Sequence, residues 1–462
     1  KITDTSGNKN LPKTITMGIS LPEETGSAVV ADVVNPIWEK VSSTVDLKAK
    51  TATIVINGTD KYFASSTLTT NNVKILVNGV EQTSGITKTL SSPTSLKETR
   101  VINGTSKEVQ YGVQYTITVS NYPIDKEQVK IQIPEGMITD ESENKNKVTD
   151  FVVYSSLRKT NTETSATSSF LGNSNIQRQQ IDKLIFQDNI DGANDTKWDV
   201  SAQKDGSIIA WYERTLHNTY VVYIGSTDGG KICANSDSSY LFAKLGSSSN
   251  CTITETISGL SNFNTITANN MSYMFYYCGY QVMTTLDLGD NFDTSNVTDM
   301  SGMFSSCGEN AMTSFELGNN FDTTKVTRMF QMFKNTGNKA LEILNLGDKF
   351  NTENVETMQE MFMSCGHMTY FDLGDKFDTS NEPDMYRMFA FCGSGTMIGL
   401  DLGPAFTKIG GNNDTDTFTG IGKDGELTIY APESIYSDKT HFKLDTNSTS
   451  TIAYTRGTIN PK

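Results

Sequence analysis

The sequence contains no apolar run close to the ~20 residues that a membrane-spanning helix needs. Positive charge is also scarce, since 38 lysines and arginines stand against 53 aspartates and glutamates, and the formal net charge is −15. A negative charge of this size argues against nucleic-acid binding. The only histidines, His217, His367 and His441, lie far apart and without the spacing of metal ligands.

Cysteine is rare as well, with six residues in 462, which is too few for a disulfide scaffold. Four cysteines occupy the same place in an internal repeat and are predicted to form a buried column of thiols. These four are Cys278, Cys307, Cys365 and Cys392. The other two, Cys233 and Cys251, fall outside the column, and in an oxidising compartment they either form a disulfide or remain free.

Motifs that carry catalysis are missing. The sequence has no Gly-x-Ser-x-Gly, no His-Glu-x-x-His, no phosphate-binding loop and no dinucleotide fingerprint. We therefore predict that the protein is not an enzyme. Carboxylates are abundant, so residue types alone leave a glycoside hydrolase open as an alternative.

The clearest feature that is present is a repeated segment that begins Met-x-x-Met-Phe and usually ends Cys-Gly. Its copies begin at Met271, Met300, Met329, Met358 and Met385. Successive copies are 29, 29, 29 and 27 residues apart. Self-similarity at such a period predicts a solenoid, in which each unit buries its apolar edge against the next.

The unit from Leu286 to Gly308 shows what each copy is expected to form. Leu286–Gly289 alternates apolar and polar residues, as a short strand does. Asn296 is a good helix N-cap, and the apolar residues that follow lie at helical spacing, so a short helix is predicted that ends at Gly308. The predicted core positions of this unit are Leu288, Phe292, Met300, Met303, Phe304 and Cys307.

Between the two strand leucines lies a polar position whose side chain is expected to face outward. In successive copies this outward column holds Asp287, Glu316, Asn345, Asp372 and Asp401, with Tyr370 in the neighbouring column. Carboxylates about 5 Å apart repel by roughly 1 kcal/mol even in water. We therefore predict a ligand face for a basic protein segment or for Ca²⁺. The alternative is a solvated sheet face that is kept acidic to block edge association.

The motif Leu-x-Leu-Gly-x-x-Phe-Asp-Thr-Ser-Asn-Val-Thr-x-Met-x-x-Met-Phe-x-x-Cys, from Leu286 to Cys307, resembles the BspA-type leucine-rich repeat of bacterial surface proteins. The resemblance covers residues 257–430. Thr336 replaces the cysteine in one copy, and another copy is two residues short. The resemblance implies a secreted or surface-attached protein that serves in adhesion or partner binding, without catalysis.

Residues 41–158 read as an all-β domain. The predicted strands are Thr51–Ile56, Val73–Val77, Gln114–Ser120, Val129–Ile133 and Thr149–Tyr154, and the predicted turns are Asn57-Gly58, Asn78-Gly79 and Asn103-Gly104. Pattern and composition resemble the immunoglobulin-like stalk modules of Gram-positive surface proteins. This resemblance implies a β-sandwich.

The remaining segments are assigned around these two domains. Residues 1–20 resemble 138–146 in their first half and are expected to be the tail of a preceding β-domain, so the chain is expected to be part of a longer protein. Linkers are predicted at 21–40 and 159–175. A β-rich N-terminal cap is predicted at 176–256, with strands at Trp198–Val200, Ile208–Tyr212, Tyr220–Ile224 and Tyr240–Leu245. Leucine-rich repeats then follow at 257–430, with a closing strand at Glu426–Tyr430, and a C-terminal cap at 431–462.

One acidic loop offers a second calcium hypothesis. Asp188, Asp191 and Asp195 surround Gly192, although their spacing is not that of an EF-hand. A turn rich in aspartate and asparagine is the alternative.

Together these features predict a multidomain β-rich protein, with an immunoglobulin-like β-sandwich followed by a capped leucine-rich-repeat α/β solenoid. The expected function is that of an extracellular adhesin on a Gram-positive type of bacterial surface. Its expected partners are surface proteins or glycans of host or neighbouring cells, with no cofactor besides Ca²⁺. A structural spacer or surface-array protein is the alternative, and a carbohydrate-active enzyme is the second alternative.

Overall fold

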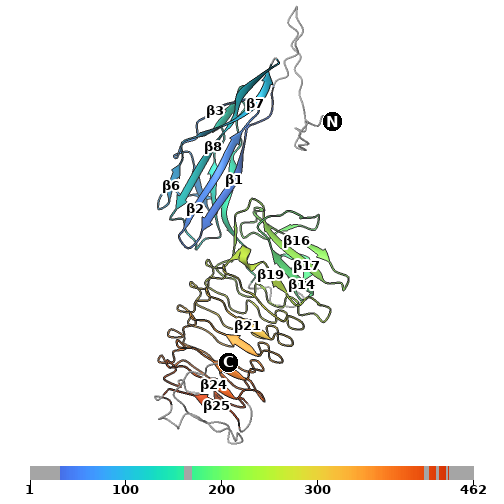
Figure 1. The fold of residues 1–462 in the computed structure, drawn as a ribbon, viewed down its shortest axis with the longest axis vertical. Coiled ribbons are helices and arrows are strands. Elements are labelled where there is room, and N and C mark those ends of the chain that lie inside the picture. Colours follow the sequence, from blue (N-terminus) through green and yellow to red (C-terminus); the bar gives the residue numbers. More distant parts are fainter. Residues whose placement is uncertain are drawn as a thin grey trace, which may run out of the picture. The chain divides into compact units, whose positions relative to one another are not determined.

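The computed structural model describes residues 32–102, 104–160, 169–409, 416–422, 426–432 and 435. Two units are separated by their contacts: the first holds the residues up to Pro123 and Val129–Val153, and the second holds Ile124–Gln128 and the residues from Tyr154 on. In Figure 1 they are coloured blue to cyan and green to red. The predicted tail at 1–20, and most of the segments predicted as a linker at 21–40 and a cap at 431–462, lie outside the described residues.

The larger sheet of the first unit is antiparallel. Its order is β1 (Ile37–Asp46), β2 (Thr51–Thr59), β8 (Thr105–Ser120) and β6 (Thr87–Leu90), and β7 (Thr94–Ile102) also pairs with β8. Every second residue of β2 is buried, including Ile54 and Ile56, while the residues between the buried ones, such as Thr53 and Val55, are partly exposed. The alternation that predicted this strand from the sequence is therefore the one that fills the core.

Smaller pairings complete the first unit. β4 (Lys74–Val77) pairs with β5 (Val80–Glu81) and β9 (Gln128–Ile133), and β3 (Phe63–Ser66) pairs with β10 (Ile138–Asp140). β11 (Thr149–Ser156) then continues into the second unit. All five strands predicted in this region are confirmed.

The predicted turn at Asn57-Gly58 is wrong, because both residues lie inside β2. A Cβ atom at Gly58 would lie 2.6 Å from the ring of Trp38, so the glycine is there to admit the indole. Asn57 accepts a hydrogen bond from Gln114 Nε2 on β8 (3.0 Å). The turn at Asn78-Gly79 is confirmed, with positive φ at both residues (48° and 78°).

The second unit begins with a five-stranded sheet. Its order is β15 (Trp198–Asp199), β16 (Ile208–Arg214), β17 (Tyr220–Ser226), β14 (Ile181–Phe186) and β19 (Ile257–Ser258). β12 (Ser169–Phe170) and β13 (Asn173–Gln177) form a hairpin that includes the end of the segment predicted as a linker, and Phe170 and Leu171 are fully buried there. The predicted strand at Tyr240–Leu245 is wrong, since this segment is a run of turns.

Short elements accompany this sheet. β18 (Lys231–Cys233) pairs in parallel with the end of β11 and with β20 (Phe263–Asn264). The 3₁₀ turn η1 (Arg178–Gln180) directly precedes β14, and the 3₁₀ turn η2 (Leu260–Asn262) lies between β19 and β20 in the sequence.

The helices predicted in the repeats are wrong. The described residues between 257 and 430 contain no α-helix, and the segment from Met300 to Gly308 is a series of turns. Gly302 and Ser306 have positive φ (60° and 56°), which an α-helix does not tolerate. Their N–H groups donate to the following copy, to the carbonyls of Phe330 (2.7 Å) and Lys334 (2.7 Å), instead of to the preceding turn.

Consecutive turns give the same apolar spacing as a helix. Met303 N–H donates to Met300 C=O (3.1 Å) and Cys307 N–H to Phe304 C=O (2.9 Å), so the chain reverses every three to four residues. The stripe that reads as one face of a helix therefore still points inward. All six residues of the predicted core of this copy are buried, and Phe304 and Cys307 have no exposed surface.

Equivalent segments of neighbouring copies pair in parallel through single bridges. The bridged residues are Asp237, Asn270, Asp299, Arg328, Thr357 and Asp384. Inside, phenylalanine rings form a column with centroid separations of 5.3–5.5 Å. The column holds Phe242, Phe275, Phe304, Phe333, Phe362, Phe389 and Phe418. We refer to residues 236–430 as the repeat stack.

Short strands form the edge of the repeat stack where Leu-x-Leu occurs. β21 (Ser314–Glu316) pairs in parallel with β22 (Ile343–Asn345), and β23 (Tyr370–Asp372) pairs with β24 (Gly399–Asp401), which pairs with β25 (Thr428–Tyr430). β21, β24 and β25 are labelled in Figure 1. Leu286–Leu288, although it has the same pattern, is not a strand.

The predicted fold class is therefore wrong. In place of an immunoglobulin-like sandwich followed by an α/β leucine-rich-repeat solenoid, the described residues form many small open sheets joined by turns. The predicted α component is missing because its hydrogen bonds run between copies and not along a helix. In the part described, no helix is long and apolar enough to cross a membrane.

Truncating the phenylalanine column should destabilise the protein strongly. We expect Phe304→Ala to lower the free energy of unfolding by ~3–5 kcal/mol, because it leaves a cavity between Phe275 and Phe333. Urea unfolding followed by circular dichroism measures this. The matched control is Phe391→Ala, whose side chain is 47 % exposed and whose loss should cost less than ~1 kcal/mol. Equal losses would contradict the stacked core.

Candidate functional site

The predicted ligand residues form one exposed face. Asp287, Glu316, Asn345 and Asp372 are exposed, and Asp401 is partly exposed. Parallel register places Glu316 opposite Asn345, and Asp372 opposite Asp401. We refer to these five residues as the outward column.

Most of the outward column also has a local structural role. Asp287 Oδ1 accepts the N–H of Gly289 (2.9 Å), Asn345 that of Gly347 (3.0 Å), and Asp372 and Asp401 those of Gly374 (2.8 Å) and Gly403 (2.9 Å). These glycines all have positive φ, between 71° and 78°. Aspartate and asparagine therefore recur here because they form a turn at the end of each strand.

The carboxylates of Asp287, Glu316 and Asp372 in the outward column remain available for a ligand. Among the described residues, no ion pair involves Asp287, Glu316 or Asp372. Each turn occupies one carboxylate oxygen of an aspartate, and Glu316 makes no such turn. Asp287, Glu316 and Asp372 therefore carry negative charge that no ion pair among the described residues neutralises.

A groove of about 640 Å³ interrupts this face between β22 and β23. Its walls include two of the largest exposed apolar side chains in the repeat stack, Ile343 (57 % exposed) and Tyr370 (50 %). Asn345 and Asp372 of the outward column also line it. The sequence predicted Asn345, Asp372 and Tyr370 on one outward face, and the structure places all three in the lining of this groove.

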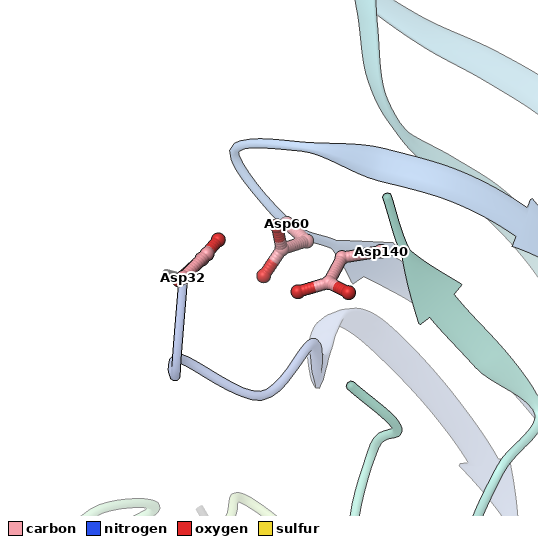
Figure 2. Close-up of side chains that lie close together, drawn as sticks. All are labelled: Asp32, Asp60 and Asp140. Carbon is pink, nitrogen blue, oxygen red and sulfur yellow. The ribbon is translucent and has the colours of Figure 1, made fainter. Parts of the chain in front are cut away.

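A second acidic cluster, in the first unit, was not predicted. Asp32, Asp60 and Asp140 place carboxylate oxygens within 4.8 Å of one another. Figure 2 shows the three side chains directed toward a common space, with Asp60 following β2 and Asp140 ending β10. Asp60 and Asp140 are only 8 % and 2 % exposed. The three residues are far apart in the sequence, and no local motif could have connected them.

The hydrogen bonds of this cluster account for much of its geometry. Asp140 accepts the N–H groups of Ser142 and Asn144 and the side-chain amide of Asn144, and Asp60 accepts the N–H of Tyr62 (2.7 Å). Carboxylate oxygens are ligands that Ca²⁺ prefers, but the ion takes six to eight oxygen ligands in all. Because Asp140 is already occupied, the cluster is best described as a set of crowded carboxylates.

Crowding should make the stability of the first unit depend on pH. Burial raises the pKa of Asp60 above the ordinary 3.8, and the charges of Asp32 and Asp140 raise it further. The folded state therefore holds this proton more tightly than the unfolded state. The resulting stability is full below pH 3.8 and is lost as the pH rises through the raised pKa.

We therefore expect Asp60→Asn to be more stable than the unchanged protein at pH 7, with a difference that shrinks as the pH is lowered toward 4. Urea unfolding of both proteins across this range provides the test. Glu135→Gln, at an exposed position in the same unit, is the control and should leave the pH dependence unchanged. A variant that is less stable than the unchanged protein at pH 7 would refute the account.

The loop proposed for Ca²⁺ forms turns. Asp188, Asp191 and Asp195 are exposed, and they are not among the described carboxylates that gather closely enough to share an ion. Instead Asn189 accepts the N–H of Asp191 (2.9 Å), and Asn194 accepts that of Thr196 (2.8 Å). The turn-rich alternative describes this geometry.

All six cysteines are free and buried, and the suggested bond between Cys233 and Cys251 is not formed. Burial raises the pKa of Cys251 to about 12, and the nearby charge of Asp182 adds to the effect. Burial likewise raises the pKa of Cys233 and of the four thiols of the column. None of these cysteines is therefore a thiolate nucleophile near neutral pH.

Thiol titration tests this arrangement. At pH 8 a thiol-specific chromogenic reagent should label none of the cysteines of the native protein, and should label six after denaturation without reductant. Ser95→Cys, at an exposed position, should add one rapidly labelled thiol to the native protein. Four thiols after denaturation would show that Cys233 and Cys251 are bonded.

Comparison with known proteins identifies a resemblance that the sequence analysis did not name. Residues 245–343 and 309–395, in two overlapping matches, are similar to the family described as Mycoplasma protein of unknown function, DUF285. No curated protein and no solved structure matches the chain. The expected identity as a BspA-type leucine-rich-repeat protein is therefore wrong, and the repeats are similar to DUF285 instead.

Proposed function

We propose that the protein is a binding protein of the bacterial cell surface, an adhesin that captures a protein ligand on the outward column and does not catalyse a reaction. The observation that carries the proposal is the row of exposed carboxylates of Asp287, Glu316 and Asp372, which form no ion pair among the described residues. This row lies beside the groove that Ile343 and Tyr370 line. Unpaired charge next to exposed apolar surface is typical of a recognition surface, since each attracts a different part of a partner.

The thiols support the absence of catalysis. Cysteine is the most reactive side chain in the repeats, yet each of the four copies that carry it turns it inward, and burial keeps it protonated. The two histidines that the structure describes, His217 and His367, are both exposed. Neither is paired with a cysteine in the described hydrogen bonds.

A spacer protein is the competing proposal, and one observation favours it. The turns formed by Asp287, Asn345 and Asp372 explain these residues without a ligand. A spacer needs only the stacking of its repeats, so its surface charges could be removed without loss of function.

Neutralising the column distinguishes the two proposals. The variant Asp287→Asn, Glu316→Gln, Asp372→Asn should bind about tenfold more weakly to the ligands that the full chain captures on an array of extracellular proteins and glycans. The estimate follows because exposed ion pairs contribute ~0.2–1 kcal/mol each. The control changes three exposed carboxylates of the same unit, Asp188→Asn, Asp191→Asn and Asp195→Asn, and should bind unchanged. Equal binding by both variants, or no binding by the full chain, supports the spacer.

A further inference from the structure

A regular series of hydrogen bonds along the repeat stack is broken at one place. Where the chain enters each short strand, an N–H group donates to the carbonyl of the equivalent residue in the preceding copy: Thr313 to Thr284 (3.2 Å), Glu342 to Thr313 (2.9 Å) and Ile398 to Thr369 (2.9 Å). Among the described residues, the bond that would connect Thr369 N–H to Glu342 C=O is missing.

A short return loop lies at the break. In other copies three residues separate the glycine from the next buried Met or Leu, as between Gly308 and Met312 or between Gly337 and Leu341. Only His367 separates Gly366 from Met368. Met312 and Leu341 N–H close a turn on their glycines (3.0 and 2.9 Å), whereas His367 N–H donates instead to Leu341 C=O (2.7 Å).

The break leaves two strand edges facing each other without pairing. Ile343 N–H donates to Thr313 C=O, and Leu373 N–H donates to Asp401 C=O, so these residues point away from the break. Bonded residues alternate along a parallel strand. The backbone groups of Leu344 on β22, and those of Tyr370 and Asp372 on β23, therefore point toward it, and no described backbone bond joins β22 to β23.

Charge and apolar surface gather around these free edges. The groove is lined by Glu342 and Asp348 as well as by Asp372, and all three are exposed. Ile343 and Tyr370 supply its apolar walls. No lysine or arginine lines it. The groove thus offers unpaired backbone groups, apolar contact area and negative charge within one depression.

We propose that this groove binds an extended segment of a partner protein in which apolar residues alternate with lysine or arginine. The proposal rests on the proposed function and specifies its ligand. An extended segment brings unpaired N–H and C=O groups that match the free edges, and its side chains alternate between two faces. One face of the segment points inward, toward the buried side chains of Leu344 and Phe371. The other face points outward beside Ile343 and Tyr370, and it carries ammonium or guanidinium groups to Glu342, Asp348 and Asp372.

The negative charge of the groove favours a basic segment over the other candidate ligands. A second copy of this chain has a net charge of −15 and is repelled by the acidic rim, as is an acidic peptide. A neutral glycan gains nothing from the carboxylate charge. A basic extended segment is the partner that uses every feature of the groove.

The test uses the full chain and a fluorescein-labelled octapeptide of alternating valine and lysine. Fluorescence anisotropy should show binding that weakens as salt is raised, and a peptide with glutamate in place of lysine should not bind. Two variants change the groove, one by closing it and the other by removing its apolar side chains. The first inserts Asn-Ala between His367 and Met368, which restores the loop length of the other copies and allows β22 to pair with β23. The second is Ile343→Ser with Tyr370→Ser.

Both variants should bind the lysine peptide at least tenfold more weakly, while Phe391→Ser, an exposed apolar residue outside the groove, should bind it unchanged. Thermal unfolding followed by circular dichroism shows whether each variant is folded. If one groove variant is not folded, peptide binding by the other groove variant tests the proposal. Binding of the glutamate peptide, or unchanged binding by the folded variants, overturns the proposal. If the outward-column variant loses array binding while both groove variants keep it, the groove proposal fails and the proposed function stands.

Discussion

The repeat stack depends on backbone hydrogen bonds that run from one copy to the next. Within each turn segment, every second N–H group donates across to the following copy, as Met300 does to Arg328 (3.0 Å) and Phe304 to Met332 (2.9 Å). These bonds hold neighbouring copies at the separation at which phenylalanine rings stack, 5.3–5.5 Å. Burial of the rings supplies the hydrophobic stabilisation, and the bonds remove the cost of burying the backbone.

These hydrogen bonds between copies require neighbouring copies to have the same length, and this constraint connects the fold to the proposed function. A copy shortened by two residues keeps its buried methionine and phenylalanine in register. Its loop still bonds to the preceding copy through His367 N–H and Leu341 C=O, but the bond from Thr369 N–H to Glu342 C=O is not made among the described residues. The mismatch is confined to the edge, where it opens a groove between β22 and β23. The core stays continuous because the deletion lies outside the stacked positions.

The sequence predicts the period, the inward stripe and the short strands, because these depend on which residues are apolar and how often they recur. It does not predict the turns, since Met300, Met303, Phe304 and Cys307 have the same spacing in a helix and in consecutive turns. Positive φ at Ser306, a residue that rarely adopts it, carries the decisive information and is not visible in the pattern. The two groups of acidic residues also differ in whether the sequence pattern predicts them. The outward column follows from alternation, whereas Asp32, Asp60 and Asp140 meet only through tertiary structure.

Amide hydrogen exchange, resolved by NMR or mass spectrometry, tests most directly whether β22 and β23 lack backbone hydrogen bonds to each other. The N–H groups of Thr369 and Tyr370 should exchange rapidly, because no carbonyl of the preceding copy accepts them, while the equivalent groups of Glu342 and Ile398 should be protected by their bonds of 2.9 Å. Protection of Thr369 and Tyr370 equal to that of Glu342 and Ile398 would show that β22 and β23 are paired, and would contradict the central claim.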